Sequence, residues 1–259
     1  MFIRVMLLTI IFVSCNDSVT SLDKLDELNY PTILHPLSDS QIQQLQSEFD
    51  TLNDDKICSK INNYCFVEAQ ICPGPSFNFG ISDDSAKLIA ANCLVKNSKF
   101  TKTYDKNNLL QNIHRVIKIN ENNSKWKVTF GPQKYKDYEI PYSFITVWIS
   151  GKEAYEIDGH WYNDVYTPLK FKFQEEDAKQ KIIGEKITWF GYGSHELTIT
   201  EETIDDNMSK AIIPIENEDS IELHVTWKIP IIYSGFIGWY VYVDVMTGVI
   251  VTITQEFMT

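Results

Sequence analysis

The sequence has few basic residues for its size. Its 259 residues include 23 lysines and arginines against 35 aspartates and glutamates, so the formal net charge at pH 7 is -12. A protein that binds the phosphate backbone of a nucleic acid needs clustered Lys and Arg. We therefore expect no nucleic-acid partner.

The sequence also lacks the short motifs that carry well-understood chemistry. It contains no H-E-x-x-H, no glycine-rich phosphate or dinucleotide loop and no G-x-S-x-G. The nearest approach is Ser194 followed by His195, and adjacent residues on a strand point to opposite faces. The five histidines are scattered, with no pair at metal-ligand spacing. We expect no enzymatic activity, no cofactor and no metal.

No apolar run near the N-terminus is long enough to span a bilayer. After Arg4, the run from Val5 to Val13 has the length of a secretory signal peptide. The segment 1–15 ends in Val-Ser-Cys and resembles a bacterial lipoprotein signal, although Phe12 stands where that family usually has Leu. The resemblance implies a lipid anchor on Cys15 as the sole membrane attachment, on the periplasmic side or the outer-membrane surface of a cell envelope. The alternative is ordinary signal-peptide cleavage nearby, with Cys15 removed.

The other four cysteines lie in one short region, at Cys58, Cys65, Cys72 and Cys93. An exported compartment permits disulfides, so we expect two bridges, in one of three pairings that spacing does not distinguish. The absence of any C-x-x-C or close Cys/His pair argues against zinc.

Prolines and predicted helix caps mark the boundaries between the parts of the chain. Residues 16–37 are predicted to be a linker, followed by an N-terminal α+β unit over 38–165 and a second unit over 166–259. Ser38 and Gln41 form a capping-box pattern that predicts a helix. Acidic residues after Ser82 predict a second helix, which carries Cys93 inward.

After residue 112 the sequence alternates in steps of two, which is typical of antiparallel sheets with one buried face. The predicted strands include "LKFKF" at 169–173, and one helix interrupts them at 174–184. The order helix, strands, hairpin occurs twice, from 82 to 158 and from 174 to the end. The predicted fold class is α+β, with antiparallel sheets each covered by a helix in two tandem units.

The stretch "GWYVYVDVMTG" breaks its alternation at Asp244, Thr247 and Gly248. An Asp side chain accepts hydrogen bonds from backbone N–H groups ahead of it, and Gly supplies the positive φ that a bulged hairpin requires. These three residues are predicted to build a structural turn.

This stretch, with the helix before it, resembles the PepSY/FTP family of thermolysin-type propeptides and exported bacterial proteins. The resemblance rests on the closing hairpin and on a helix that begins with acidic residues, at Tyr242, Val243, Asp244, Thr247, Gly248 and Ile250, and at Glu175, Glu176, Ala178 and Ile182. It covers 174–257 well and 82–158 weakly, since the first hairpin turn lacks the Asp and Thr. The resemblance implies a non-catalytic module that binds or modulates another protein, such as a protease.

The densest polar cluster is "EIDGHWYND" at 156–164. His160, Trp161, Tyr162 and Asp164 are its candidate binding residues, and they support an alternative function as a small-molecule or glycan-binding lipoprotein. The competing interpretation is a loop whose Trp and Tyr pack back onto the sheet.

Overall fold

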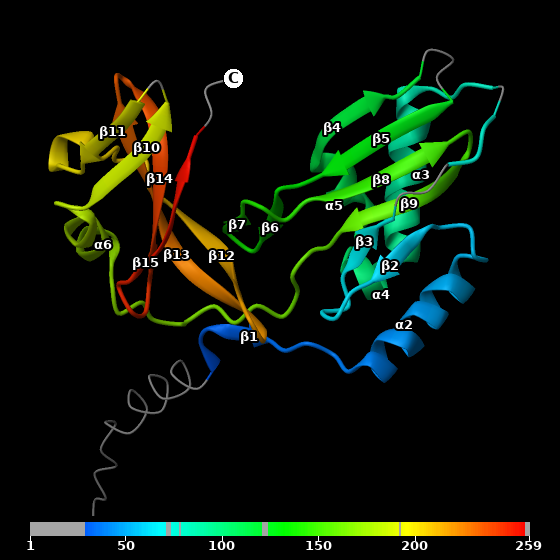
Figure 1. The fold of residues 1–259 in the computed structure, drawn as a ribbon, viewed down its shortest axis with the longest axis horizontal. Helices are drawn as coiled ribbons and strands as arrows, with labels where there is room; N and C mark the ends of the chain where they lie inside the picture. The colour runs from blue at the N-terminus through cyan, green and yellow to red at the C-terminus, as the bar shows by residue number, and fades with distance from the viewer. Residues whose placement is uncertain (1–28, 71–73, 78, 121–123, 192, 257–259) are drawn as a thin grey trace, which may run out of the picture.

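The structure is a computed structural model that describes residues 29–70, 74–77, 79–120, 124–191 and 193–256. The described chain forms two lobes, each built on its own mainly antiparallel sheet, and the hairpin of residues 133–140, which belongs to the second sheet, lies between them (Figure 1). No helix in these ranges is long and apolar enough to cross a membrane.

The first lobe contains a six-stranded sheet in the order β2-β3-β9-β8-β5-β4. Its strands are β2 (Ser59–Ile61), β3 (Val67–Ala69), β4 (Ile113–Lys118), β5 (Lys125–Phe130), β8 (Ile145–Ser150) and β9 (Glu153–Gly159). Its helices are α2 (Asp39–Leu52), α3 (Asp83–Lys96), α4 (Ser98–Thr101) and α5 (Lys106–Gln111). The helix α3 buries its alanines and Leu94 in one core with Val128, Val147 and Ile149 of the sheet.

Both predicted helix starts in this lobe are confirmed. The Ser38 N–H donates to Gln41 Oε1 at 2.9 Å, and the Ser38 hydroxyl oxygen accepts the Gln41 N–H, which completes the capping box. Ser82 accepts the N–H of Ser85 at 3.2 Å, and Asp83 and Asp84 occupy the first turn of α3. These bonds satisfy N–H groups that a helix start otherwise leaves without partners.

The second lobe contains the order β15-β14-β13-β12-β7-β6, with β1 paired to β13 beyond the end of β14. Its strands are β1 (Thr32–Leu34), β6 (Gln133–Tyr135), β7 (Tyr138–Ile140), β12 (Ser209–Asn217), β13 (Ser220–Tyr233), β14 (Phe236–Asp244) and β15 (Ile250–Gln255). The pair β12–β7 is parallel. The helix α6 (Glu175–Ile182), the hairpin β10 (Lys186–Gly191) and β11 (Gly193–Thr198), and the 3-10 turn η1 (Glu201–Thr203) complete the lobe.

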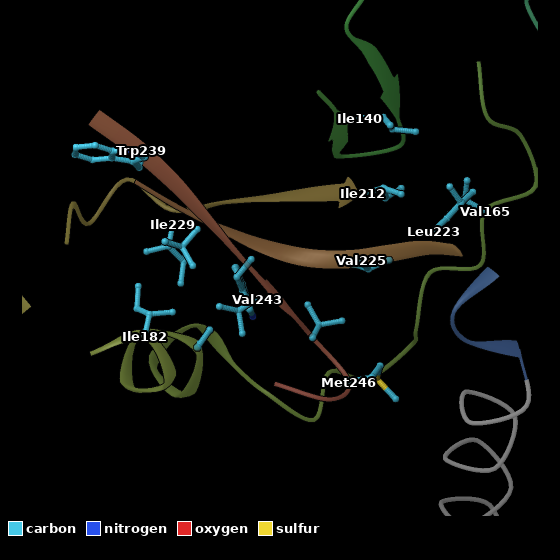
Figure 2. Packing of buried hydrophobic residues seen from close by; sticks show 14 of the residues in the cluster. Ile140, Val165, Ile182, Ile212, Leu223, Val225, Ile229, Trp239, Val243 and Met246 are labelled. Atoms are coloured by element: carbon cyan, nitrogen blue, oxygen red, sulfur yellow. The ribbon is translucent and has the colours of Figure 1, made fainter. Parts of the chain in front are cut away.

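One face of the second sheet forms the core of its lobe. Ile182 points from α6 toward Val243 and Ile229 of the sheet, and all three are fully buried (Figure 2). Burying an aliphatic side chain of this size stabilises a fold by about 1.5–3 kcal/mol. The other face has a smaller buried cluster of Ala211, Ile213 and Tyr242. We call this second face of the sheet the open face.

The predicted α+β class is therefore present as helices combined with mainly antiparallel sheets. The repeated order of elements is present too. A helix precedes the meander β4-β5-β8-β9 in one lobe, and another precedes β12-β13-β14-β15 in the other. The lobes differ in their inserted hairpins, since β6–β7 interrupts the first meander and β10–β11 lies before the second.

Three sequence-based expectations about this architecture are wrong in part. The linker predicted over 16–37 includes β1, which pairs with β13, while residues 16–28 lie outside the described residues. The boundary at 165 fails because β6 and β7 of the first unit join the second sheet. The segment 169–173 is not a strand. Phe173 instead donates its N–H to the Val245 carbonyl, and its own carbonyl accepts the Trp227 indole N–H, so the end of this segment lies against the turn after β14.

Candidate functional site

The turn between β14 and β15 is organised by one carboxylate. Asp244 Oδ1 accepts the backbone N–H of Met246 at 2.8 Å and that of Thr247 at 2.7 Å. Gly248 has φ +68° and donates its N–H to the Asp244 carbonyl at 2.9 Å. The Thr247 hydroxyl oxygen accepts the N–H of Val249 at 3.3 Å. Asp244, Thr247 and Gly248 thus make the turn contacts expected from their sequence.

The second oxygen of the same carboxylate faces away from the turn. Asp244 Oδ2 accepts the Tyr30 hydroxyl at 2.5 Å and lies 2.8 Å from His224 Nδ1. The other ring nitrogen, His224 Nε2, lies 3.0 Å from Glu222 Oε2. We call these four residues the carboxylate–histidine network. It joins the segment before β1 to β13 and to the β14 turn.

Strand geometry explains how these residues meet. Glu222 and His224 are two positions apart on β13 and therefore share a face. Asp244 pairs with Thr226, the next residue of that face, on the neighbouring strand β14. Tyr30 arrives from the chain just before β1, and its hydroxyl also accepts the Val225 N–H at 2.9 Å. The network lies on the open face of the second sheet.

The network favours the charged forms of His224 and Asp244. Burial lowers the pKa of His224, but its hydrogen bonds to Asp244 and Glu222 outweigh burial and raise the pKa overall. Burial raises the pKa of Asp244, but bonds from His224, Tyr30 and the turn N–H groups hold it below its usual value. Burial, followed by the charge of Asp244, raises the pKa of Tyr30, which stays a neutral donor.

Both ring nitrogens of His224 are engaged in this arrangement. A protonated histidine that donates to two carboxylates has no free ring nitrogen to take a proton from a substrate. Spacing along the sequence does not predict this network, because His224 stands apart from the other four histidines. The alternation of β13 places Glu222 and His224 on one face, but only the pairing of β13 with β14 brings Asp244 to them.

A groove of about 600 Å³ lies farther along the same open face. Its lining combines three tyrosines with charged and polar side chains, from Glu139, Pro141, Tyr142, Lys228, Tyr240, Tyr242, Thr254, Gln255 and Glu256. Lys228 Nζ lies 3.3 Å from Glu139 Oε1 and 4.2 Å from the centre of the Tyr240 ring. Tyr142 is 57% exposed at the groove. The edge strand β15 forms one wall.

The candidate binding residues of 156–164 do not form one site. Trp161 is buried in the core of the first lobe, and Tyr162 is buried in the core of the second. Asp164 is exposed, with φ +56°. The two aromatic side chains point in different directions because these adjacent residues lie at the junction of two lobes and pack into different cores.

His160 lies between these two residues and packs as an aromatic ring. It stacks on Phe66 with ring centres 3.4 Å apart, and burial lowers its pKa to about 4. It lines a cavity of about 400 Å³ together with Tyr64, Glu68 and Asp158, among others. Over the described residues, no three His, Cys, Asp or Glu side chains are placed to hold a metal ion.

The two-bridge expectation for the cysteines is wrong. Cys65 and Cys93 carry free thiols, and Cys93 is buried against the core of the first lobe, as its helix position predicted. Cys58 is disulfide-bonded. Cys72 and the proposed anchor Cys15 lie outside the described residues. An apolar environment accounts for a free Cys93, since a buried cysteine behaves as a small hydrophobic residue.

Comparison with known proteins gives little further information. No family model matches the chain, and no curated protein matches it. Among solved structures, the C-terminal domain of YpeB from Bacillus megaterium is similar to it, with 11% sequence identity and a TM-score of 0.32. The alignment covers 85% of this chain and 98% of that one. A similarity of this size carries no argument. The family of this chain therefore stays a prediction from its sequence.

Proposed function

We propose that this chain is a non-catalytic lipoprotein of the bacterial cell envelope, whose second sheet binds another protein, such as a protease. The proposal combines the sequence resemblances at Cys15 and at the closing hairpin with the character of the open face. The carboxylate–histidine network supports a non-catalytic role, because both ring nitrogens of His224 already face carboxylates.

The groove beside β15 is the observation that carries the proposal. It brings Tyr142, Tyr240 and Tyr242 to one surface with Lys228. Tyrosine is enriched at protein interfaces and among the residues that dominate binding energy, because it offers a rigid apolar ring with a polar tip. An extended segment that lies beside a sheet edge is a common mode of peptide recognition.

Site-specific photo-crosslinking in cells that produce the protein tests this proposal. Benzoylphenylalanine in place of Tyr142 should crosslink to a defined protein that mass spectrometry identifies. The same substitution at Tyr104, which is 62% exposed in the other lobe, serves as the matched control. Identical crosslinked products from both positions, or none from Tyr142, would argue against the groove as the binding surface.

The anchor has a separate test. Cys15→Ser should move the protein from the membrane fraction to the soluble fraction, because a lipid attached to this cysteine would be the only anchor. Metabolic labelling with a fatty acid should mark the natural protein and leave the variant unlabelled. Membrane association that survives the substitution would contradict the lipoprotein proposal and leave the groove unaffected.

A further inference from the structure

The strand β15 differs from the strands at the other ends of the two large sheets. Strands β2 and β6 have three residues each and carry Lys60 and Lys134. Strand β4 has six residues and carries Arg115 and Lys118. Short length and charge are the usual protections of an edge against pairing with another chain. The six residues of β15, "IVTITQ", include no charge and no proline.

The hydrogen-bond pattern shows which backbone groups of β15 face outward. Glu256 donates its N–H to the Gly238 carbonyl at 2.9 Å, and Thr254 pairs with Tyr240. Because antiparallel pairs alternate between bonded and non-bonded positions, Thr252 and Thr254 direct their N–H and C=O groups toward β14. Ile253 and Gln255 direct theirs away from it. No described strand pairs with this side.

The side chains beside this edge indicate what could lie there. Thr254, Gln255 and Glu256 line the groove, while Ile253 belongs to the other face and is 36% exposed. A segment added next to β15 would therefore present one set of alternate side chains to Ile253 and the other set to the groove.

Charge favours basic side chains on the side of the added segment that faces the groove. Lys228 is already paired with Glu139, so Glu256 is the groove carboxylate without an ion pair among the described residues. The exposed ring of Tyr142 offers a face on which a guanidinium can stack. The whole chain has a net charge of -12, which attracts a cationic partner.

We infer that β15 binds an extended basic segment of another protein as an added strand, with apolar residues beside Ile253 and Arg or Lys residues over the groove. This inference rests on the proposed function and specifies the chemistry of the partner. Backbone hydrogen bonds to Ile253 and Gln255 supply part of the affinity, and the groove selects the charge.

Two probe peptides test it by fluorescence anisotropy against the purified protein. One peptide alternates valine with arginine, and the other alternates valine with glutamate. The basic peptide should bind at least about tenfold more tightly than the acidic one, and the difference should shrink at high salt. Glu256→Lys should reduce or reverse the preference.

Proline substitution separates edge pairing from general attraction. Ile253→Pro removes only an outward N–H, and the fold should tolerate it because proline is found at such edge positions. Since the lost N–H would bond to the added strand, the substitution should weaken binding of the basic peptide by about tenfold. Lys118→Pro is the matched control on the charged edge, because Ile119 donates to Lys125 and the Lys118 N–H therefore faces outward. It should leave binding unchanged. Thermal unfolding of both variants establishes that they are folded, and Ile253→Lys provides a second variant that blocks the edge.

The outcomes are distinct. Equal loss of binding in Ile253→Pro and Lys118→Pro, or no loss in Ile253→Pro, would overturn strand addition at β15. Tighter binding of the acidic peptide would overturn the basic partner. Concentration-dependent dimers that Ile253→Pro abolishes, without peptide binding, would assign the edge to a second copy of the chain. None of these results would remove a Tyr142-specific crosslink, which tests the proposed function independently.

Discussion

His224 Nδ1 lies 2.8 Å from Asp244 Oδ2, and this contact ties the middle of β13 to the turn that closes the β14–β15 hairpin. Asp244 is fully buried and uses its other oxygen for the N–H groups of Met246 and Thr247. One side chain therefore both shapes a local turn and holds a contact between strands. The stability of the fold should depend on its charge.

The first prediction concerns pH. The pKa of His224 is raised in the folded protein, so its contribution is complete below its ordinary value of 6.5 and is lost as pH rises through the folded value. The pKa of Asp244 is lowered, so its contribution is present above 3.8 and is lost as pH falls through the folded value. The contribution of the network to the free energy of unfolding should therefore be greatest between pH 3.8 and pH 6.5.

His224→Ala should reduce the free energy of unfolding by about 2 kcal/mol near pH 5.5, because hydrogen bonds to charged groups contribute about 1.5–3 kcal/mol. The difference from the natural protein should become smaller in alkaline solution, where His224 loses its charge. Urea unfolding at several pH values measures both quantities. His195→Ala, which removes an exposed ring stacked on Trp189 outside the network, is the matched control for the loss of a histidine side chain. A constant difference at every pH would contradict the charge argument.

The second prediction concerns the hydroxyl of Tyr30. Tyr30→Phe leaves the buried Val225 N–H without its acceptor and removes a donor to Asp244. The free energy of unfolding should fall by about 1–3 kcal/mol, the cost of an unsatisfied buried group. Hydrogen exchange should accelerate at the Val225 amide more than at other amides of β13. Tyr104→Phe, on an exposed side chain, should change neither measurement.

The third prediction concerns Gly248. A Cβ added there would lie 2.6 Å from the Phe173 ring, at a backbone φ of +68°. Gly184 also has a positive φ, +91°, but a Cβ there meets nothing within 4 Å. Gly184→Ala should cost about 1–2 kcal/mol from backbone conformation alone. Gly248→Ala should cost at least about 1 kcal/mol more, because Phe173 must move. Thermal unfolding of both variants measures the loss of stability in each and therefore the difference between them.

The fourth prediction concerns the thiols. Burial raises the pKa of Cys93 to about 12 and also raises that of the half-buried Cys65. A neutral thiol reacts slowly with iodoacetamide, because the thiolate is the nucleophile. Under non-reducing conditions, peptide mapping should find Cys65 and Cys93 alkylated after unfolding, and Cys93 unmodified in the folded protein. Failure to alkylate either residue in the unfolded protein would restore the two-bridge scheme.

Local chemistry accounts for what sequence reasoning predicted correctly. The helix starts at Ser38 and Ser82 and the turn at Asp244 depend on hydrogen bonds within a few residues. The long strands from β12 to β15 show alternation over six residues or more. Three residues are too few to display a period of two, so the sequence does not predict strands β1, β2, β3, β6 and β7.

The sequence by itself determined the α+β class, the repeated order of helix and meander, and the Asp244 turn, because each depends on short-range periodicity or capping. The tertiary structure decided which strands share a sheet, and that placed β1, β6 and β7 in the second lobe. It also brought Tyr30 and His224 to Asp244, and it separated Trp161 from Tyr162. Strand pairing between distant segments sets these positions, and no local pattern encodes which strand a given edge meets.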